Sequence, residues 1–313
     1  MNEDLVLAPK IEHLLAQGGP VVALESALIT HGFAYPASLE ITREMATAIR
    51  AAGAEAAAIG IWEGMPLIGL NDLQIDRLAA DSEAVKVSVR DLPLTRLRAS
   101  SGSGNGGTTV AATALLAQRA GIRVFATGGI GGVHRRHPED ISADLPVLAT
   151  TPIVVVCAGA KSILDLPRTL EYLETWGVPV VGWRTEEFPA FYSRHSGLPV
   201  DASASSTDDI VDIYRRQQAL GLPQALLVTV PVPAEHEVPA EVVEPLIAQA
   251  VAEAEAQGVT GKDVTPFILA RLVSLSEAKT RRANQSLLIQ NAEVAAKIAV
   301  ALAESESGPP CAP

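Results

Sequence analysis

Short apolar runs alternate with segments of helical periodicity over the first two thirds of this chain. The runs have the length and the Val, Ile and Leu content of buried strands, and they occupy residues 21–24, 122–126, 153–156, 178–183 and 225–230. Segments with apolar residues at helical spacing separate these runs, at residues 39–52, 108–120, 166–176 and 208–220. This alternation predicts an α/β fold in which helices flank a largely parallel sheet, an α/β/α sandwich.

A hairpin makes the predicted sheet mixed. Residues 56–62 and 65–70 have strand character, and only a Glu-Gly pair separates them, which is typical of two antiparallel strands. A further short strand is expected at residues 85–89. The Gly, Ser and Asn residues at 102–107 predict a loop that leads into the next helix.

The last third of the chain is predicted to be helical. Residues 239–257, 266–276 and 284–302 all have helical spacing. No low-complexity linker and no internal repeat divides the chain, so we expect one domain over residues 1–303. Residues 304–313 are expected to form a disordered tail.

Composition argues against several classes of protein. Apolar residues make up 48% of the 313 residues, which argues against disorder, and the net charge of −12 argues against a basic nucleic-acid-binding face. The two cysteines, Cys157 and Cys311, are too few for a disulfide framework or a cysteine-rich zinc site. The N-terminus lacks a signal-peptide pattern, and no continuous apolar run approaches the roughly 18 residues of a membrane span. We therefore expect a cytoplasmic protein that binds neither nucleic acid nor membranes.

Polar residues follow several of the predicted strands. Glu25 and Ser26 end the first strand, Thr127 and a glycine run at 128–132 follow another, and Lys161 follows a third. In α/β sheets, ligands bind beyond the carboxyl ends of the strands. Because the carboxyl ends of parallel strands share one edge, we expect these groups to converge in space.

Two of these residues are candidates for the reaction chemistry. Lys161 is either a lysine whose charged end reaches solvent or a nucleophile, because apolar flanking chain disfavours the charged amine. The small residues Ala158, Gly159 and Ala160 before it would let a substrate carbon approach, as Schiff-base formation requires. Glu25 is either paired structurally or a carboxyl whose pKa is raised for proton donation.

Asp140, Ser142 and Asp144 form an oxygen-rich cluster. Such ligands suit Mg²⁺ or Mn²⁺ rather than zinc, and the alternative is an acidic helix start. The glycine run at 128–132 is either an anion-binding backbone segment or a simple turn. The chain has no GxxxxGK[ST] motif and no GxGxxG in a complete dinucleotide-binding unit, which argues against ATP hydrolysis and nicotinamide binding.

Four further polar residues have open roles. His31 and His134 are more often structural than catalytic at such positions. Lys86 is either a phosphate ligand or a solvated strand residue. Asn284, at a predicted helix start, is either a substrate contact or a simple N-cap.

Four motifs carry a resemblance to a known enzyme family. They are Val21–Ser26 followed by Thr30-His31-Gly32, Phe125–His134, Asp140–Leu145 and Cys157–Asp165. In this order they resemble the signature of the pseudouridine-5′-phosphate glycosidases, a family that includes the indigoidine-synthase A-like proteins. The resemblance runs from about residue 5 to about residue 303.

The resemblance implies roles for particular residues of this chain. Lys161 matches the nucleophile of the family, Glu25 its proton donor and Asp140 its metal ligand, with Mn²⁺ as the expected ion. We expect Asp144 to relay a proton as well as to contact the substrate. The full set of expected substrate contacts is Lys86, Val110, Thr127, His134, Ser142, Ala143, Asp144 and Asn284.

The implied reaction is the reversible cleavage of the C–C glycosidic bond of pseudouridine 5′-phosphate. The products would be uracil and ribose 5-phosphate, formed through a Schiff base between Lys161 and the ribose. A homotrimer is also implied. Two alternatives stay open: a lyase that acts on another C-glycoside phosphate, and a sugar-phosphate-binding protein without catalytic activity.

Two segments depart from the family pattern. Residues 99–107 form a longer stretch than the Gly-Lys-Asn-Gly-Ala-Thr-Thr of the family and lack its lysine. Residues 135–139 differ in the approach to Asp140. Both differences concern local substrate contacts rather than the implied reaction.

Overall fold

One mixed sheet is the framework of the computed structural model, which describes residues 5–100, 102, 104–259 and 264–307. The strands lie in the order β1-β4-β3-β2-β7-β9-β13-β11-β12; β6 also pairs with β3, and β5 pairs with β6. Their bounds are β1 Val6–Leu7, β2 Val21–Glu25, β3 Glu55–Trp62, β4 Met65–Ile68, β5 Val85–Val87, β6 Gly106–Thr108, β7 Val124–Ala126, β9 Val154–Cys157, β11 Val180–Trp183, β12 Ala202–Ala204 and β13 Leu226–Thr229. A separate antiparallel pair joins β8 (Val133–His134) to β10 (Leu164–Asp165).

The parallel body of the sheet consists of seven neighbouring strands, in the spatial order β3, β2, β7, β9, β13, β11 and β12. Every residue of β9 and β13 is buried, which explains why these strands are continuous apolar runs rather than alternating ones. The predicted hairpin is confirmed, because β3 and β4 pair antiparallel. Its turn residues Glu63 and Gly64 have φ angles of 50° and 82°, the left-handed geometry of a tight hairpin turn.

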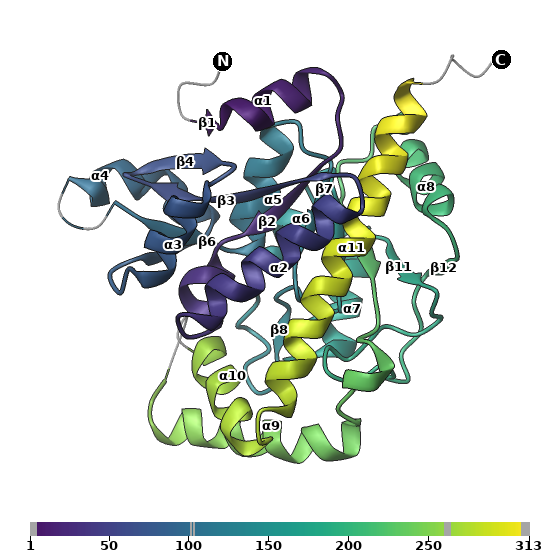
Figure 1. The fold of residues 1–313 in the computed structure, drawn as a ribbon. Helices are drawn as coiled ribbons and strands as arrows, with labels where there is room; N and C mark the ends of the chain where they lie inside the picture. Colours follow the sequence, from purple (N-terminus) through teal and green to yellow (C-terminus); the bar gives the residue numbers. More distant parts are fainter. Residues whose placement is uncertain (1–4, 101, 103, 260–263, 308–313) are drawn as a thin grey trace.

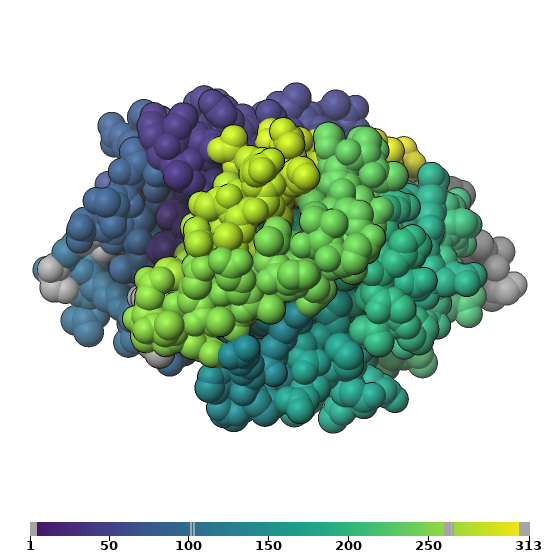
Figure 2. Space-filling model, turned by 90° about the horizontal axis from the view of Figure 1, so that it is seen from below, coloured from purple at the N-terminus to yellow at the C-terminus, as the bar shows by residue number. Residues whose placement is uncertain are grey.

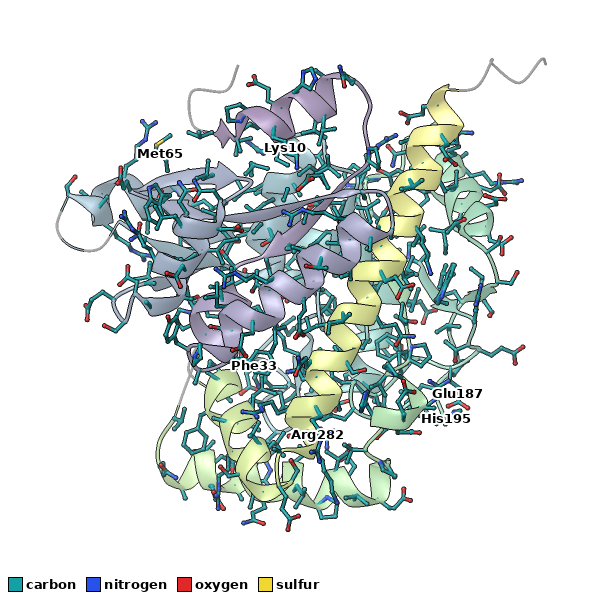
Figure 3. All side chains as sticks on the ribbon, in the orientation of Figure 1. Lys10, Phe33, Met65, Glu187, His195 and Arg282 are labelled. Carbon is teal, nitrogen blue, oxygen red and sulfur yellow. The ribbon has the colours of Figure 1, made fainter. Side chains whose placement is uncertain are left out.

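Helices cover both faces of the sheet, so the predicted α/β/α sandwich is confirmed (Figure 1). On the near face of Figure 1, α11 crosses β2, β7 and β9 and packs between α2 and α8. Helices α5, α6 and α7 lie behind the sheet, and side chains fill the space between these layers (Figure 3). The bounds of these helices are α2 Ala37–Ala51, α5 Val110–Arg119, α6 Asp144–Leu148, α7 Leu166–Thr175, α8 Thr207–Ala219 and α11 Lys279–Ser307.

Two further helices cover the carboxyl edge of the sheet. Helix α9 (Ala240–Ala256) packs on α10 (Val264–Leu275), and α10 in turn packs on the π-helical turn Leu28–Gly32 that follows β2. Figure 2 views the molecule from this side and shows α9 and α10 spread across its centre. The remaining helices are α1 Pro9–Ala16, α3 Asp72–Ala80 and α4 Thr95–Ala99, with 3₁₀ turns at Val89–Leu94 and Ala234–His236.

Several boundary predictions were wrong, among them three in which the type of element changes. The predicted loop at 102–107 ends in strand β6, which pairs with β3 and β5; residue 103 of that loop lies outside the described residues. The predicted strand at 85–89 ends at Val87 and continues as a 3₁₀ turn. Residues 304–307, predicted as part of a disordered tail, are helical because α11 continues to Ser307, and the rest of the predicted tail, residues 308–313, lies outside the described residues.

Helix α11 is long and apolar enough, by length and composition, to cross a membrane. The sequence prediction overlooked it because polar and charged residues, among them Glu293 and Lys297, interrupt the apolar run. In the fold, however, 61% of its apolar window is buried, and the helix contacts the sheet, α2 and α8. Burial inside the protein therefore accounts for its apolar character.

Candidate active site

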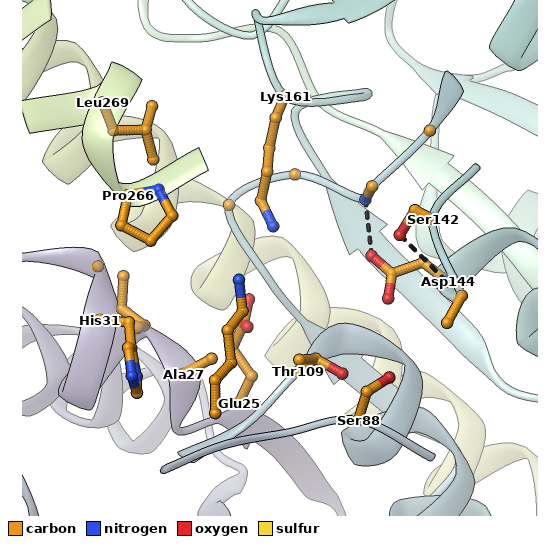
Figure 4. Close-up of a pocket in the computed structure, with 18 of the residues that line it drawn as sticks. Glu25, Ala27, His31, Ser88, Thr109, Ser142, Asp144, Lys161, Pro266 and Leu269 are labelled. Atoms are coloured by element: carbon orange, nitrogen blue, oxygen red, sulfur yellow. Dashed lines mark hydrogen bonds between the residues drawn. The ribbon is translucent and has the colours of Figure 1, made fainter. Parts of the chain in front are cut away.

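A pocket of about 490 Å³ opens at the carboxyl edge of the sheet (Figure 4). One side of it is polar, with Ser88, Thr109, Ser142 and Asp144, whereas His31, Pro266 and Leu269 lie on the other side. The side chains of Lys161 and Glu25 project between the two sides. The pocket therefore presents a nucleophile and an acid between a hydrogen-bonding wall and a largely apolar wall.

Most of the predicted site residues line this one pocket. They are Glu25, Lys86, His134, Asp140, Ser142, Ala143, Asp144, Lys161 and Asn284. The expected convergence of groups from several strand ends is therefore confirmed. Val110 and Thr127, by contrast, are buried and do not line the pocket. Ser26 is also buried, where its hydroxyl donates to the Ile59 carbonyl oxygen over 2.6 Å.

Lys161 enters the pocket from a loop rather than directly from a strand end, because β9 already ends at Cys157. In this loop Gly159 has a φ of 82°, and a Cβ atom there would lie 2.3 Å from the Pro189 carbonyl oxygen. The backbone N–H of Lys161 donates to the Ile130 carbonyl oxygen over 3.0 Å. The small residues before Lys161 thus shape a tight loop that is tied to the glycine run.

Arg135 fixes the chain on the other side of Lys161. Its Nε donates to the Leu164 carbonyl oxygen over 3.0 Å, and its Nη2 donates to the Ser162 carbonyl oxygen over 2.8 Å. The same guanidinium makes a bidentate ion pair with Glu244 of α9, at 2.5 and 2.9 Å. A planar group with five donors suits such a bridge. Sequence reasoning noted only that residues 135–139 differ from the family pattern and missed this contact.

Glu25 is the last residue of β2, and the charged groups Lys161, Asp144 and Lys86 act on it. Burial raises the pKa of Glu25 above its ordinary value, although Lys161, the Thr127 hydrogen bond and Lys86 oppose this shift. A raised pKa suits a carboxyl group that must keep its proton near neutral pH. The Thr127 hydroxyl donates to Glu25 Oε1 over 2.5 Å. The Thr127 hydroxyl thus turns toward Glu25, and its expected contact with the substrate stays a prediction.

Both carboxylate oxygens of Asp144 accept backbone hydrogen bonds. Oδ1 accepts from Ala111 at the N-terminus of α5 over 2.9 Å, and Oδ2 accepts from Gly131 over 2.7 Å. A Cβ atom at Gly131 would lie 2.1 Å from Ser142 Oγ and 2.7 Å from Asp144 Oδ2, so only glycine fits there. Asp144 also begins α6, which makes the helix-start interpretation correct for this residue. Its expected proton relay stays a prediction.

Asp140 is the candidate metal ligand. Its side chain is 53% exposed, and its Oδ2 lies 3.8 Å from His134 Nε2. Within residues 5–100, 102, 104–259 and 264–307, no group of three or more His, Cys, Asp or Glu side chains is placed to hold a metal ion. Strongly hydrated divalent ions often bind through one or two carboxylates and keep several waters. The residues therefore fit a hydrated ion on Asp140 rather than a fully enclosed metal site.

Val110 and Asn284 occupy other positions in their helices than the sequence predicted. Val110 is the first residue of α5, behind the N-cap Thr109, so its expected contact involves the backbone at a helix N-terminus, where N–H groups attract anions. Asn284 is not an N-cap, because α11 already begins at Lys279. It is instead a buried residue within the helix, 9% exposed, that lines the pocket.

Sequence reasoning missed the apolar wall of the pocket. By residue type alone its members do not differ from ordinary core residues, so no local pattern identifies them. Phe33, for example, precedes α2 on the side facing α10 (Figure 3). Pro266 and Leu269 form this wall in Figure 4, and the pocket is also lined by the apolar residues Ala27, Leu28, Phe33 and Leu288.

Comparisons with known proteins place this arrangement in a family. The family model described as indigoidine synthase A like protein matches residues 10–301. The chain belongs to the indigoidine synthase A-like family. The predicted family membership is thus confirmed over nearly the whole chain.

Two relatives of this indigoidine synthase A-like chain are named pseudouridine-5′-phosphate glycosidase. The protein from Methylobacterium nodulans is 50% identical over 98% of this chain and 90% of its own length. The protein from Caldanaerobacter subterraneus subsp. tengcongensis is 46% identical over 96% of this chain and 98% of its own. The relatives therefore match along their full length, not in one segment.

Two solved structures have the same fold. The prealnumycin C-glycosynthase in complex with ribulose 5-phosphate has a TM-score of 0.88 and 39% identity, and covers 98% of this chain and 99% of its own. An indigoidine synthase A-like protein from Thermotoga maritima has a TM-score of 0.87 and 36% identity, and covers 97% of this chain and 98% of its own. Both likenesses agree with the architecture described above.

Proposed function

We propose that this chain is a pseudouridine-5′-phosphate glycosidase that converts pseudouridine 5′-phosphate and water reversibly to uracil and ribose 5-phosphate. The observation that carries this proposal is that Lys161 and Glu25 project into one pocket between a polar and an apolar wall. The raised pKa of Glu25, caused by burial, suits a proton donor. The names of full-length relatives at 46–50% identity support the same substrate.

The first chemical step opens the ribose ring. An oxocarbenium route with two carboxylates suits N- and O-glycosides, but the leaving atom here is a carbon, C5 of uracil. In the proposed step Glu25 gives its proton to O4′, the C1′–O4′ bond breaks, and O4′ becomes a hydroxyl group. The neutral Nζ of Lys161 attacks C1′, forms a C–N bond and loses one proton.

The second step breaks the C–C bond. The lone pair of the Lys161 nitrogen forms a C1′=N bond, and the electrons of the C1′–C5 bond go to C5, which takes up a proton. Uracil leaves, and a ribose Schiff base remains on Lys161. Water then adds to C1′ and releases ribose 5-phosphate and the free amine. The relay of a proton through Asp144 is part of the proposal.

The remaining polar residues bind and orient the substrate. The N-terminus of α5 and Lys86 provide positive electrostatic potential for the 5′-phosphate, and Ser142 and Ala143 lie on the same polar side. Asp140 would hold the Mn²⁺ ion, which when bound neutralises phosphate charge. Asn284 and His134 would contact the base or the sugar, and the apolar wall would exclude water from the flat face of uracil.

Uracil release from pseudouridine 5′-phosphate tests the proposal, measured with and without Mn²⁺. We expect turnover of this substrate, much weaker turnover of pseudouridine, which lacks the phosphate, and none of uridine 5′-phosphate. Tight binding of ribose 5-phosphate without any uracil release would instead support a non-catalytic binding protein.

A second candidate is a lyase or synthase for another C-glycoside phosphate. The fold shared with a prealnumycin C-glycosynthase and the apolar wall favour it. Formation of a C-glycoside from ribose 5-phosphate and a hydroxylated aromatic ring, without uracil release, would support this candidate over the first.

We also propose that the protein is a cytoplasmic homotrimer, as the family resemblance implies. Its mass in solution should therefore be three times the 32.7 kDa of one chain. Sedimentation equilibrium measures that mass directly, and a monomer would contradict the trimer.

A further inference from the structure

Asn291 connects helix α11 to the turn that follows β7. The residue is fully buried, with 0% exposure. Its Nδ2 donates to the Thr127 carbonyl oxygen over 2.8 Å and lies 3.4 Å from the Gly128 carbonyl oxygen. A buried carbonyl oxygen without a hydrogen-bond partner is unfavourable, so this contact stabilises the turn.

We infer that Asn291 is a positioning residue for the proposed reaction: by fixing the turn at Thr127 and Gly128, it sets the orientation of the Glu25 carboxyl group. The inference rests on the proposed function, in which Glu25 is the proton donor. Asn291 itself does not line the pocket, so it acts through the turn at Thr127 and Gly128.

Each polar group of Thr127 is engaged. Its backbone N–H donates to the Val156 carbonyl oxygen over 3.0 Å, its carbonyl accepts from Asn291, and its hydroxyl donates to Glu25 Oε1. The residue is 1% exposed. Any shift of the Thr127 backbone that carried the hydroxyl away from Glu25 would also disturb two buried hydrogen bonds. The side chain of Asn291 therefore restrains the backbone position from which the Thr127 hydroxyl reaches Glu25.

Close packing keeps Asn291 at a fixed distance from the turn. A Cβ atom at Gly128 would lie 3.2 Å from Leu288 Cδ2, one helical turn before Asn291. The glycine thus allows α11 to approach the backbone closely enough for the amide to reach the carbonyl. A longer or bulkier residue at position 128 would separate the helix from the turn.

The pH dependence of the reaction reports on this arrangement. Lys161, Asp144 and Lys86 act electrostatically on Glu25, and His31 and His134 line the same pocket. Burial raises the pKa of Glu25, and the hydrogen bond from Thr127 lowers it. Loss of that bond would raise the pKa of Glu25 further, so the alkaline limb of the kcat profile would move to higher pH.

The test compares four variants in uracil release from pseudouridine 5′-phosphate, after thermal unfolding has shown which of them are folded. Asn291→Leu removes the amide, and Asn291→Ala removes it while leaving space for a water molecule. Thr127→Val removes the hydroxyl directly. Gln290→Leu is the matched control, since Gln290 is the preceding residue of α11 and its Oε1 has no hydrogen-bond partner.

We expect kcat to fall about tenfold to a hundredfold in the folded Asn291 variants, with KM changed less than about threefold. The alkaline limb should shift upward, as in Thr127→Val, and the combination of Thr127→Val with Asn291→Leu should cost little more than Thr127→Val alone. Gln290→Leu should match the wild type.

An Asn291 variant with the kcat and pH profile of Gln290→Leu would overturn the inference, as would fully additive effects of Asn291→Leu and Thr127→Val. If neither Asn291 variant folds, the double-variant comparison is made with Asn291→Ser. Glu25→Gln, assayed alongside, separates the two claims. If Glu25→Gln is inactive while the Asn291 variants are normal, only the positioning role fails; if Glu25→Gln is fully active, the proposed function and the inference both fail.

Discussion

Glu25 is half-buried at the carboxyl end of β2, where partial loss of hydration makes an ionised carboxylate unfavourable and so reduces the stability of the fold. Burial raises its pKa in the folded state above the unfolded value of about 4.3. Such a group contributes its full stability below the unfolded pKa, and this contribution is lost as the pH rises through the folded pKa. Near neutral pH Glu25 therefore lowers the stability of the fold, as is common for residues of a candidate active site.

Replacing Glu25 with Gln should raise the melting temperature at pH 8, because a neutral amide has no buried charge. The difference from the wild type should disappear at about pH 3, well below the unfolded pKa, where the carboxyl is protonated in both states. Activity should fall about a hundredfold or more. Thermal unfolding across this pH range is the measurement, and equal melting temperatures at pH 8 would contradict a raised pKa.

Gly131 allows the backbone to approach Ser142 and Asp144. Gly131→Ala should reduce kcat about a hundredfold, because its Cβ would collide with Ser142 Oγ and Asp144 Oδ2 and displace the polar wall. Gly128→Ala is a milder change in the same run, since its Cβ would meet only side-chain atoms, Leu288 Cδ2 at 3.2 Å, Leu287 Cδ1 at 3.5 Å and Asn284 Oδ1 at 3.6 Å, and should cost less activity. Steady-state kinetics of both variants checks this, and equal loss in the two would refute the argument.

The loop that carries Lys161 depends on contacts from other elements. Its first half is bonded to the glycine run after β7, and its second half is bonded to Arg135, which also pairs with α9. The ion pair with Glu244 is partly exposed, so on its own it should contribute little, about 0–1 kcal/mol. The two carbonyl contacts of Arg135 are therefore the more important part of the bridge.

Arg135→Met should lower kcat about tenfold to a hundredfold, because the backbone on the C-terminal side of Lys161 loses both of its guanidinium contacts. Glu244→Gln keeps these contacts and should stay within about threefold of the wild type. Single-turnover uracil release separates the chemical step from product release. A larger effect of Glu244→Gln than of Arg135→Met would show that the ion pair, not the carbonyl contacts, holds the loop.

The strands and helices of the body were predictable because burial imposes a local periodicity on the sequence. Strand β6 was not, because it forms through pairing with β3 and β5 rather than through apolar residues. Its glycines are required by contacts distant in sequence: a Cβ at Gly107 would lie 2.2 Å from Thr30 Oγ1. The start of α11 was placed five residues late, because the polar residues at 279–282 hide the helical period.

The residue types of the candidate site were predictable from the sequence, but the hydrogen bonds that connect these residues were not. Motifs identified Lys161, Glu25 and Asp144 as candidates, and all three line one pocket. The hydrogen bonds of Thr127 to Glu25 and of Asn291 to Thr127 join residues 102 and 164 positions apart. No local pattern contains such contacts, so the supporting residues became visible only in the structure.

At the scale of the whole molecule, three layers meet at the pocket. The parallel strands bring Glu25 and the Lys161 loop to one edge, α5 presents its N-terminus there, and α10 and α11 close the apolar side. The function therefore depends on the complete fold rather than on one segment. This agrees with relatives that match over nearly the entire chain.

The most direct test of this account is to trap ribose 5-phosphate on the protein with borohydride and to locate the adduct by peptide mass spectrometry. The account predicts a reduced adduct on the peptide that contains Lys161, and no adduct in Lys161→Ala. Under conditions in which the wild type releases uracil, an adduct on Lys86 instead, or the lack of any adduct on Lys161, would contradict it.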